Sequence, residues 1–234
     1  MKYQWGPVAE KTGNPKSAFI TKPPTEMVEQ KLVANKVPVI IGVNKNEGAA
    51  ICSASKAVDT QGHILFCLSR IYSNNLFCFP VILDNEELVQ QLNGSWGIHA
   101  PEIFMYDVGR NVEVADLEGA NRKLRHHYFR NLDVAVSTEQ HLTDMYSDWF
   151  FNRGAQISAQ SHSTVAPTYT YLYTYYGGFS VLDLLNYHNY EPPTHTDEFF
   201  YLFPYLMIPP PHTVEEIDFS KKLVRLWVSF ARTG

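Results

Sequence analysis

One carboxylate and one histidine in this sequence lie where acid–base chemistry is plausible. Glu47 is the last residue but one of the stretch VPVIIGVNKNEG, residues 37–48, in which an apolar run meets a polar turn. His195 follows Pro192 and Pro193 and precedes a hydrophobic run. Histidine titrates near neutrality and is the commonest general base, and a carboxylate can orient an imidazole and stabilise its protonated form. Glu47 and His195 are therefore the candidate catalytic pair.

Each of the two residues also has an ordinary interpretation, since turn carboxylates and proline-flanked surface loops are common. Two features favour a shared role. If 37–43 is a parallel strand, Glu47 lies beyond its carboxyl end, where ligands bind in open α/β sheets. An acid that precedes a histidine along the chain is also the order in which these residues follow the serine of an α/β-hydrolase triad.

The remaining candidates for chemistry carry weaker signals. Ser53 and Lys56 match an SxxK nucleophile motif, but the SDN element that accompanies this motif is absent. His126 and His127 lie in a basic helical segment, where exposure to solvent explains them. The sequence has no GxSxG elbow, phosphate-binding glycine loop, dinucleotide fingerprint or HExxH motif.

The three cysteines, Cys52, Cys67 and Cys78, are odd in number and form no CxxC pair. They define neither a disulfide framework nor a zinc site, and at most one bridge can form within the chain. Which two would pair is left open by the sequence. We expect no metal ion and no organic cofactor.

Composition narrows the class of protein. The 234 residues are 45% hydrophobic, with a formal net charge of −5 and no long run of Lys or Arg. This favours a globular protein with a sizeable core and argues against nucleic acid as a partner. No apolar segment is long enough to span a membrane, and the first residues lack the apolar region of a signal peptide.

Two segments are predicted to be strands. Residues 37–43 are apolar and β-branched without alternation, which is typical of a strand buried on both faces of a parallel sheet. In residues 167–178, tyrosines alternate with threonine and leucine, so the tyrosines should share one face. The tyrosines are Tyr169, Tyr171, Tyr173 and Tyr175.

Most of the remaining chain is predicted to be helical. The clearest helix covers 140–157, with an apolar stripe, and weaker helices are expected at 26–36, 64–76, 85–92 and 120–129. A capping box at Thr213 opens a last helix. The stripes consist of Leu142, Met145, Tyr146, Trp149 and Phe150 in the first and Leu223, Leu226, Trp227 and Phe230 in the last. This pattern indicates part of an α/β sheet.

At these motifs the chain resembles the type-B carboxylesterases, the group that includes cholinesterases and insect esterases. VPVIIGVNKNEG is similar to the family's acid-bearing strand and turn, THTDEFFYLF to its histidine segment, and LWVSFARTG to the close of its final helix. The resemblance implies that Glu47 and His195 are the triad acid and histidine. It also implies one partial α/β-hydrolase domain over 1–234, the C-terminal half of such an enzyme, with a mainly parallel and incomplete sheet.

Within this partial domain, we expect a helical insertion at 49–163 and the histidine loop with the terminal helix at 164–234. Aromatic residues of the insertion are expected either to line an ester pocket or to lie in the core. These residues are Phe66, Tyr72, Phe77, Phe79, Trp96 and Phe104. Pro192, Pro193 and Thr194 stand where the family usually has a glycine shortly before the histidine.

The nucleophilic serine and the glycine-rich oxyanion loop of the family have no counterpart in these 234 residues. We therefore expect a fragment of a carboxylic ester hydrolase that is inactive alone, with an N-terminal half as structural partner and hydrophobic small-molecule esters as substrates. The alternative is a non-catalytic, cholinesterase-like adhesion or interaction module. The coding sequence upstream of Met1 would distinguish these functions. The cellular compartment stays open.

Overall fold

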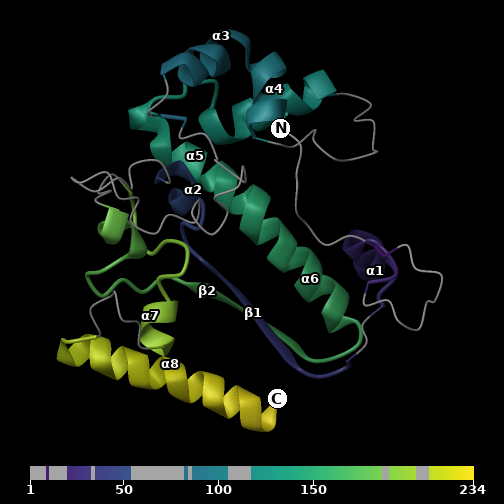
Figure 1. The fold of residues 1–234 in the computed structure, drawn as a ribbon, viewed down its shortest axis with the longest axis vertical. Coiled ribbons are helices and arrows are strands. Elements are labelled where there is room, and N and C mark those ends of the chain that lie inside the picture. Colours follow the sequence, from purple (N-terminus) through teal and green to yellow (C-terminus); the bar gives the residue numbers. More distant parts are fainter. Residues whose placement is uncertain are drawn as a thin grey trace.

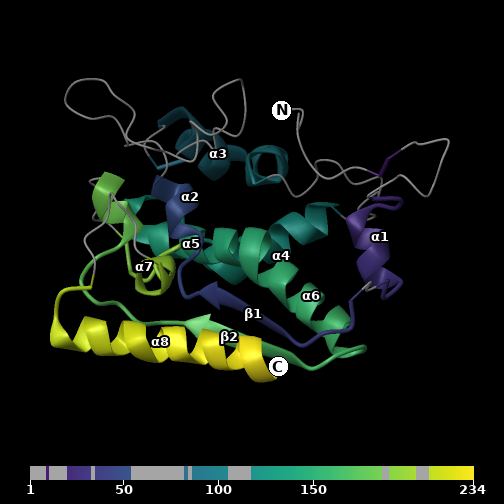
Figure 2. The ribbon, with the colours of Figure 1, turned by 60° about the horizontal axis from the view of Figure 1, so that its bottom comes forward.

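The computed structural model describes residues 9–10, 20–32, 35–53, 82–83, 86–104, 117–185, 190–203 and 211–234. Two strands lie at its centre, with helices on both faces (Figure 1). One long helix, α8 (Val214–Thr233), covers one face, and α6 (Arg153–Ser163) contacts both strands from the other (Figure 2). This is a layered α/β arrangement, and all the described strands belong to one small sheet.

The two strands pair in parallel, as the sequence predicts. β1 (Val39–Asn44) and β2 (Thr168–Tyr173) run in register from Val39 beside Thr168 to Asn44 beside Tyr173. A parallel pair needs a long crossover, and the helical elements between the strands provide it. Gly42 permits this packing, because a Cβ atom there would lie 1.9 Å from the ring of Tyr171.

The predicted tyrosine face is confirmed by its contacts with α8. The ring of Tyr169 lies 5.8 Å from that of Phe230, the ring of Tyr171 lies 5.2 Å from Trp227, and Tyr175 stacks at 3.7 Å on Phe219. Aromatic pairs at such separations bury large apolar areas and add specific edge and stacking contacts. The alternating tyrosines thus attach the last helix to the sheet.

The predicted cap of α8 is also confirmed, whereas the prediction that Leu226 belongs to the apolar stripe of this helix is wrong. The Thr213 hydroxyl accepts a hydrogen bond from the Glu216 amide at 3.1 Å, and the Glu216 carboxylate accepts one from the Thr213 amide at 2.9 Å. Leu226 is 52% exposed. Because Phe219 and Trp227 face the sheet at a spacing of two turns, the neighbouring position of Leu226 is turned towards solvent.

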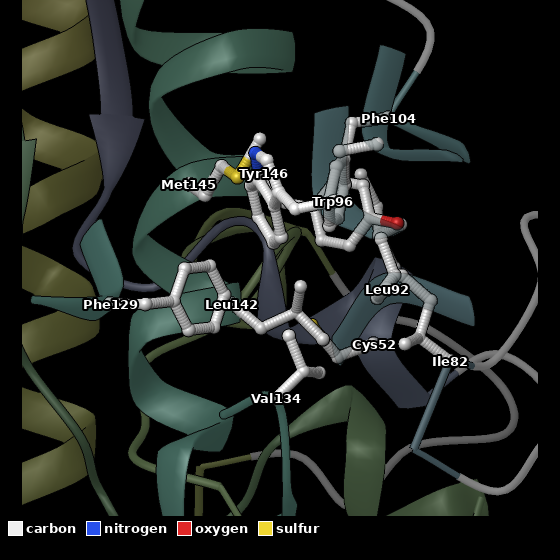
Figure 3. Packing of buried hydrophobic residues seen from close by; sticks show 12 residues of the cluster. Cys52, Ile82, Leu92, Trp96, Phe104, Phe129, Val134, Leu142, Met145 and Tyr146 are labelled. Atoms are coloured by element: carbon white, nitrogen blue, oxygen red, sulfur yellow. The ribbon is translucent and has the colours of Figure 1, made fainter. Parts of the chain in front are cut away.

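Helices make up the described part of the chain between the strands. They are α2 (Ala49–Ser53), α3 (Glu86–Ile103), α4 (Leu117–Phe129), the 3₁₀ turn η1 (Val136–Thr138), α5 (Glu139–Tyr146), the π turn η2 (Ser147–Asn152) and α6. The elements α2, α3, α4 and α5, with the segments beside them, share an apolar cluster (Figure 3) of Cys52, Ile82, Leu92, Trp96, Phe104, Phe129, Val134, Leu142, Met145 and Tyr146, among other residues. The predicted helix at 64–76 lies outside the described residues.

The predicted helix at 140–157 is longer and less regular than expected. Helical structure continues from Glu139 to Ser163, interrupted by the π turn η2. Leu142, Met145 and Tyr146 are buried in the cluster, and Trp149 and Phe150 pack against it while partly exposed. The apolar stripe is therefore confirmed, and the π turn is an addition that the stripe does not reveal.

Shorter elements complete the fold. α1 is confined to Pro24–Glu29 and ends well before residue 36, because Lys31 adopts a left-handed φ of 55° that is typical of a helix terminus. The 3₁₀ turn η3 (Val181–Leu185) and the short helix α7 (Phe199–Leu202) flank the predicted histidine loop. Among the described helices, none is long and apolar enough to cross a membrane.

Candidate active site

The structure brings the two predicted site residues into contact. Glu47 lies in the turn that follows β1, and His195 lies in the loop that precedes α7. The Glu47 carboxylate oxygen Oε2 and the His195 ring nitrogen Nδ1 are 2.6 Å apart, although the residues are 148 positions apart in the sequence. β1 leads into this region at its carboxyl end, towards α2 (Figures 1 and 2).

The two side chains differ in their access to solvent. The Glu47 side chain is 8% exposed, whereas the His195 ring is 33% exposed. A carboxylate can only accept a hydrogen bond, so a pair with ionised Glu47 requires the proton of a neutral imidazole to be on Nδ1. The other ring nitrogen, Nε2, is then the one free to accept a proton from a reacting group.

The backbone around Glu47 fixes the position of its carboxylate. The second oxygen, Oε1, accepts a hydrogen bond from the Asn44 amide at 2.7 Å. The next residue, Gly48, donates its amide to the Ser147 hydroxyl at 2.8 Å. A Cβ atom at Gly48 would lie 2.2 Å from the Thr143 carbonyl oxygen, so only glycine allows the turn to approach the α5–η2 helix so closely.

A buried aspartate also holds the histidine loop. The Asp197 carboxylate accepts hydrogen bonds from the Thr194 amide at 2.7 Å, the Val181 amide at 2.9 Å and the Ser180 hydroxyl at 2.9 Å. Burial raises the pKa of the Asp197 carboxyl from 3.8 to about 6, against the opposing effect of these hydrogen bonds. Asp197 therefore connects η3 to the residue immediately before His195.

Two asparagines connect the Glu47 turn to the histidine loop. The Asn44 side-chain amide donates to the Thr194 carbonyl at 2.7 Å, and the Asn46 side-chain amide donates to the Glu191 carbonyl at 2.7 Å. The Asn46 backbone amide also donates to the Pro193 carbonyl at 3.1 Å. We refer to residues 44–48, 180–181 and 190–198 as the strand-end junction.

The π turn places an aromatic ring beside the histidine. The ring of Phe151 lies 4.9 Å from the ring of His195, centroid to centroid, at an angle of 45°. Phe151 belongs to η2 and is partly buried. π turns inside α-helices occur frequently at functional sites. Residue spacing alone did not single out Phe151, because its ring is not part of the helical apolar stripe.

Comparison with known proteins identifies the family of this chain. A model of the carboxylesterase family matches residues 1–234. The chain belongs to the carboxylesterase family. Membership implies the α/β-hydrolase fold, and the small parallel sheet with its many helices is consistent with an incomplete version of it.

Individual relatives are insect and mammalian esterases. Esterase FE4 of Myzus persicae is 25% identical over 212 residues, which cover 88% of this chain and 32% of the relative. Carboxylesterase 1C of Rattus norvegicus is 26% identical over 220 residues, covering 92% and 33%. Venom carboxylesterase-6 of Apis mellifera is 23% identical over 184 residues, covering 78% and 27%. This carboxylesterase-family chain thus spans about a third of the length of these relatives.

The structure describes only some of the other candidate residues of this carboxylesterase-family chain. Ser53 ends α2, and Lys56 lies outside the described residues. His126 and His127 are exposed on α4, as predicted. In the described part of the chain, no group of three His, Cys, Asp or Glu side chains is arranged to hold a metal ion.

The cysteines and the aromatic residues of the insertion are accounted for in part. Cys52 is buried as a free thiol, and burial raises its pKa to about 12, so it is not a nucleophile near neutral pH. Trp96 and Phe104 lie in the apolar cluster, with ring centroids 5.4 Å apart, and so belong to the core. The other cysteines and the other aromatic residues named for the insertion lie outside the described residues. They are Phe66, Cys67, Tyr72, Phe77, Cys78 and Phe79.

Proposed function

We propose that this chain supplies the acid and the base of a serine carboxylesterase, with Glu47 and His195 as two members of a Ser-Glu-His triad. The contact of 2.6 Å between Glu47 Oε2 and His195 Nδ1 supports this most strongly. It joins residues from two motifs that resemble the family's acid and histidine segments. The acid is buried and the imidazole is accessible, as the two roles require.

In the proposed mechanism, a serine attacks the ester carbonyl carbon while His195 accepts the hydroxyl proton at Nε2. The imidazolium then protonates the leaving alcohol, and Glu47 stabilises its positive charge and keeps Nδ1 protonated. A water molecule hydrolyses the acyl-enzyme in the same way. The serine and the donors that stabilise the tetrahedral oxyanion come from a segment outside these 234 residues, because this sequence contains neither motif.

Hydrophobic small-molecule esters are the proposed substrates. Phe151 presents an aromatic ring next to His195, so the space beside the base is apolar on that side. An ester group that reaches His195 would place its non-polar substituent near this ring, where apolar contact is favourable. The proposed pocket is completed by the rest of the protein.

The proposed structural partner is the remainder of a longer chain. Leu172 on β2 is 60% exposed, and Val37 beside β1 is also largely exposed. The described sheet has only two strands, and a two-stranded sheet is marginally stable without further cover. We propose that 1–234 is one partial domain, with a helical insertion at 49–163 and a histidine and terminal-helix part at 164–234.

A non-catalytic interaction module is the competing function. The acid–histidine contact favours the hydrolase, because an adhesion role makes no demand on an imidazole held by a buried carboxylate. Esterases use this contact to set the tautomer of the base. The coding sequence upstream of Met1 separates the two functions. A GxSxG elbow encoded there supports the hydrolase, and a substituted serine supports the interaction module.

The first experiment treats the 234-residue chain alone with a fluorophosphonate probe, which labels activated serines. We expect no labelling above that of heat-denatured chain. Loss of the nucleophile alone costs serine hydrolases on the order of a million-fold in rate. Labelling of a serine within 1–234 would show that the nucleophile is not external and would overturn the assignment.

The second experiment uses the protein encoded by the complete open reading frame. We expect Glu47→Gln to lower kcat for p-nitrophenyl esters by about 10⁴-fold, because the imidazole loses the anion that orients it. His195→Ala should lower kcat by about 10⁶-fold. Glu215→Gln, which changes an exposed acid on α8, is the matched control and should leave kcat unchanged. Equal activity of Glu47→Gln and wild type would refute the role of Glu47.

A further inference from the structure

Asn44 contacts both halves of the acid–histidine pair. It is the last residue of β1 and is only 1% exposed. Its backbone amide donates to Glu47 Oε1 at 2.7 Å, while the other carboxylate oxygen, Oε2, contacts His195. The strand end therefore fixes the acid directly, through a group that any residue other than proline would offer at this position.

The Asn44 side chain makes the second connection. Its amide nitrogen donates to the Thr194 carbonyl at 2.7 Å, and this carbonyl belongs to the residue immediately before His195. The same nitrogen donates to the Glu198 carboxylate, three residues after His195. The amide thus holds the histidine loop on both sides of the imidazole.

We propose that Asn44 is a positioning residue that sets the separation of Glu47 and His195. This inference rests on the proposed function for its catalytic meaning, although the positioning itself is a structural property. The Asn44 backbone orients the acid and its side chain orients the loop of the base. Glu47 and the His195 loop are therefore both positioned by the same residue, at the end of a paired strand.

The chemistry of the position requires an amide. The two acceptors, a carbonyl and a carboxylate, need two N–H donors from one side chain, and an asparagine NH₂ group provides both. Aspartate would place a second acceptor against the Thr194 carbonyl and the Glu198 carboxylate. Alanine would leave the buried Thr194 carbonyl without this donor, and loss of a buried hydrogen bond is costly.

Asn121 provides the matched control. It is also a buried asparagine, 3% exposed, and its side-chain amide also donates to a backbone carbonyl, that of Gly97, at 3.0 Å. It lies on α4 in the helical region. Replacement of Asn121 therefore removes the same type of interaction without touching the strand-end junction.

The experiment measures the His195 tautomer in the 234-residue chain labelled with ¹⁵N-histidine. His195→Gln assigns the signal, and spectra are recorded at low temperature with an osmolyte that favours the folded state. In wild type we expect neutral His195 to carry its proton on Nδ1. In Asn44→Ala we expect a mixture of His195 tautomers. We also expect the Hδ1 proton to exchange with water about tenfold faster or more, because the charge-assisted contact between Glu47 and His195 is loosened.

Asn121→Ala should keep the wild-type tautomer and exchange rate. Asn44→Ser, which retains one hydroxyl donor, should fall between wild type and Asn44→Ala. A wild-type tautomer and exchange rate in Asn44→Ala would overturn the proposal. Unfolding of both Asn44 variants while Asn121→Ala stays folded would also overturn it, because Asn44 would then be required for the fold itself.

This result is distinct from the outcome for the proposed function. The tautomer reports how His195 is held and requires no serine or substrate. If Glu47→Gln leaves esterase activity intact while Asn44→Ala alters the tautomer, the positioning stands and the catalytic role fails. The reverse pattern would support the triad and refute the positioning role of Asn44.

Discussion

The helical region and the strand-end junction are held together by different interactions. In the helical region, large apolar side chains such as Phe104, Phe129 and Tyr146 are almost completely buried against one another (Figure 3). In the junction, the buried residues are mainly polar, and Asn44 and Asp197 make hydrogen bonds between segments that are distant in sequence. Apolar burial is non-directional, whereas a hydrogen bond fixes distance and angle.

This difference separates the source of stability from the source of geometry. The apolar cluster contributes most of the hydrophobic free energy that stabilises the described residues, because burial of each large side chain is worth about 1.5–3 kcal/mol. The hydrogen bonds of the junction each contribute about 0.5–1.5 kcal/mol net. Their main effect is to define where Glu47 and His195 lie. Four substitutions test this division.

The largest effect is expected from Phe129→Ala in the helical region. Phe129 is fully buried, with its ring 5.4 Å from that of Trp96. Removal of a buried phenylalanine ring leaves a cavity and typically costs about 3–5 kcal/mol. We expect the free energy of unfolding, measured by urea denaturation, to fall by this amount. A loss below that of a surface substitution would show that the cluster is not the main source of stability.

Asp197 should make the junction sensitive to pH. Its pKa is raised from 3.8 to about 6 by burial, so between about pH 4 and pH 6 the folded chain binds its proton more tightly than the unfolded chain. Stability should therefore rise as pH falls through this window, and the ionised carboxylate costs on the order of 3 kcal/mol above it. Urea denaturation from pH 4 to pH 7 measures this dependence.

Asp197→Asn should remove that part of the pH dependence. The variant should be less stable than wild type near pH 4, where the wild-type carboxyl is protonated, because an amide cannot accept all the hydrogen bonds that the carboxyl group receives from Thr194, Val181 and Ser180. This difference should shrink towards pH 7, because the neutral amide avoids the cost of ionisation. Asp133→Asn, at an exposed acid, is the control and should keep the wild-type slope. An unchanged slope in Asp197→Asn would contradict the assignment.

A somewhat smaller effect is expected from Gly48→Ala, where the two regions meet. The added methyl group would lie 2.2 Å from the Thr143 carbonyl oxygen and 2.6 Å from the Ser147 amide, so backbone must move. Such overpacking typically costs about 1–3 kcal/mol. Gly94→Ala is the control, since a methyl group there would meet nothing within 4 Å apart from its chain neighbours and the backbone of its own helix. Equal unfolding free energies for the two variants would show that the turn is not pressed against the helix.

The smallest effect is expected from Lys45→Met. Lys45 forms an ion pair with Glu191 across the junction, but both side chains are about half exposed. Exposed pairs contribute about 0–1 kcal/mol, and salt screens them. We expect a change within this range at low salt and none at high salt. A loss as large as that of Gly48→Ala would mean that electrostatic attraction, rather than buried hydrogen bonding, closes the junction.

Local patterns were sufficient to predict several parts of the fold. The alternation of Tyr169, Tyr171, Tyr173 and Tyr175 predicted a shared face, and Thr213 predicted the start of α8. These features depend on neighbours two to four residues away. The contact between Glu47 and His195 could be anticipated only from motif order, because the contact itself joins segments 148 residues apart.

The residues that hold the site were not predicted. Asn44 and Asp197 belong to the same stretches as Glu47 and His195, but their roles depend on which backbone groups the fold brings beside them. Polar residues at a strand end are common, so their type alone is not informative. The burial of Asn44 beside the exposed Lys45 becomes visible only when both segments are in place.

The π turn η2 makes the helix that carries Phe151 sensitive to the deletion of a single residue. A π turn accommodates one residue more than the corresponding α-helical turn. Deletion of one residue between Ser147 and Asn152 would let the helix become regular, while the residues before and after the turn kept their orientation, because the wider turn had absorbed the extra residue. A one-codon deletion would thus shift Phe151, which lies within the turn, relative to His195 while the helix gained regular hydrogen bonds. In evolution, such a change would alter the surroundings of the base without altering either Glu47 or His195.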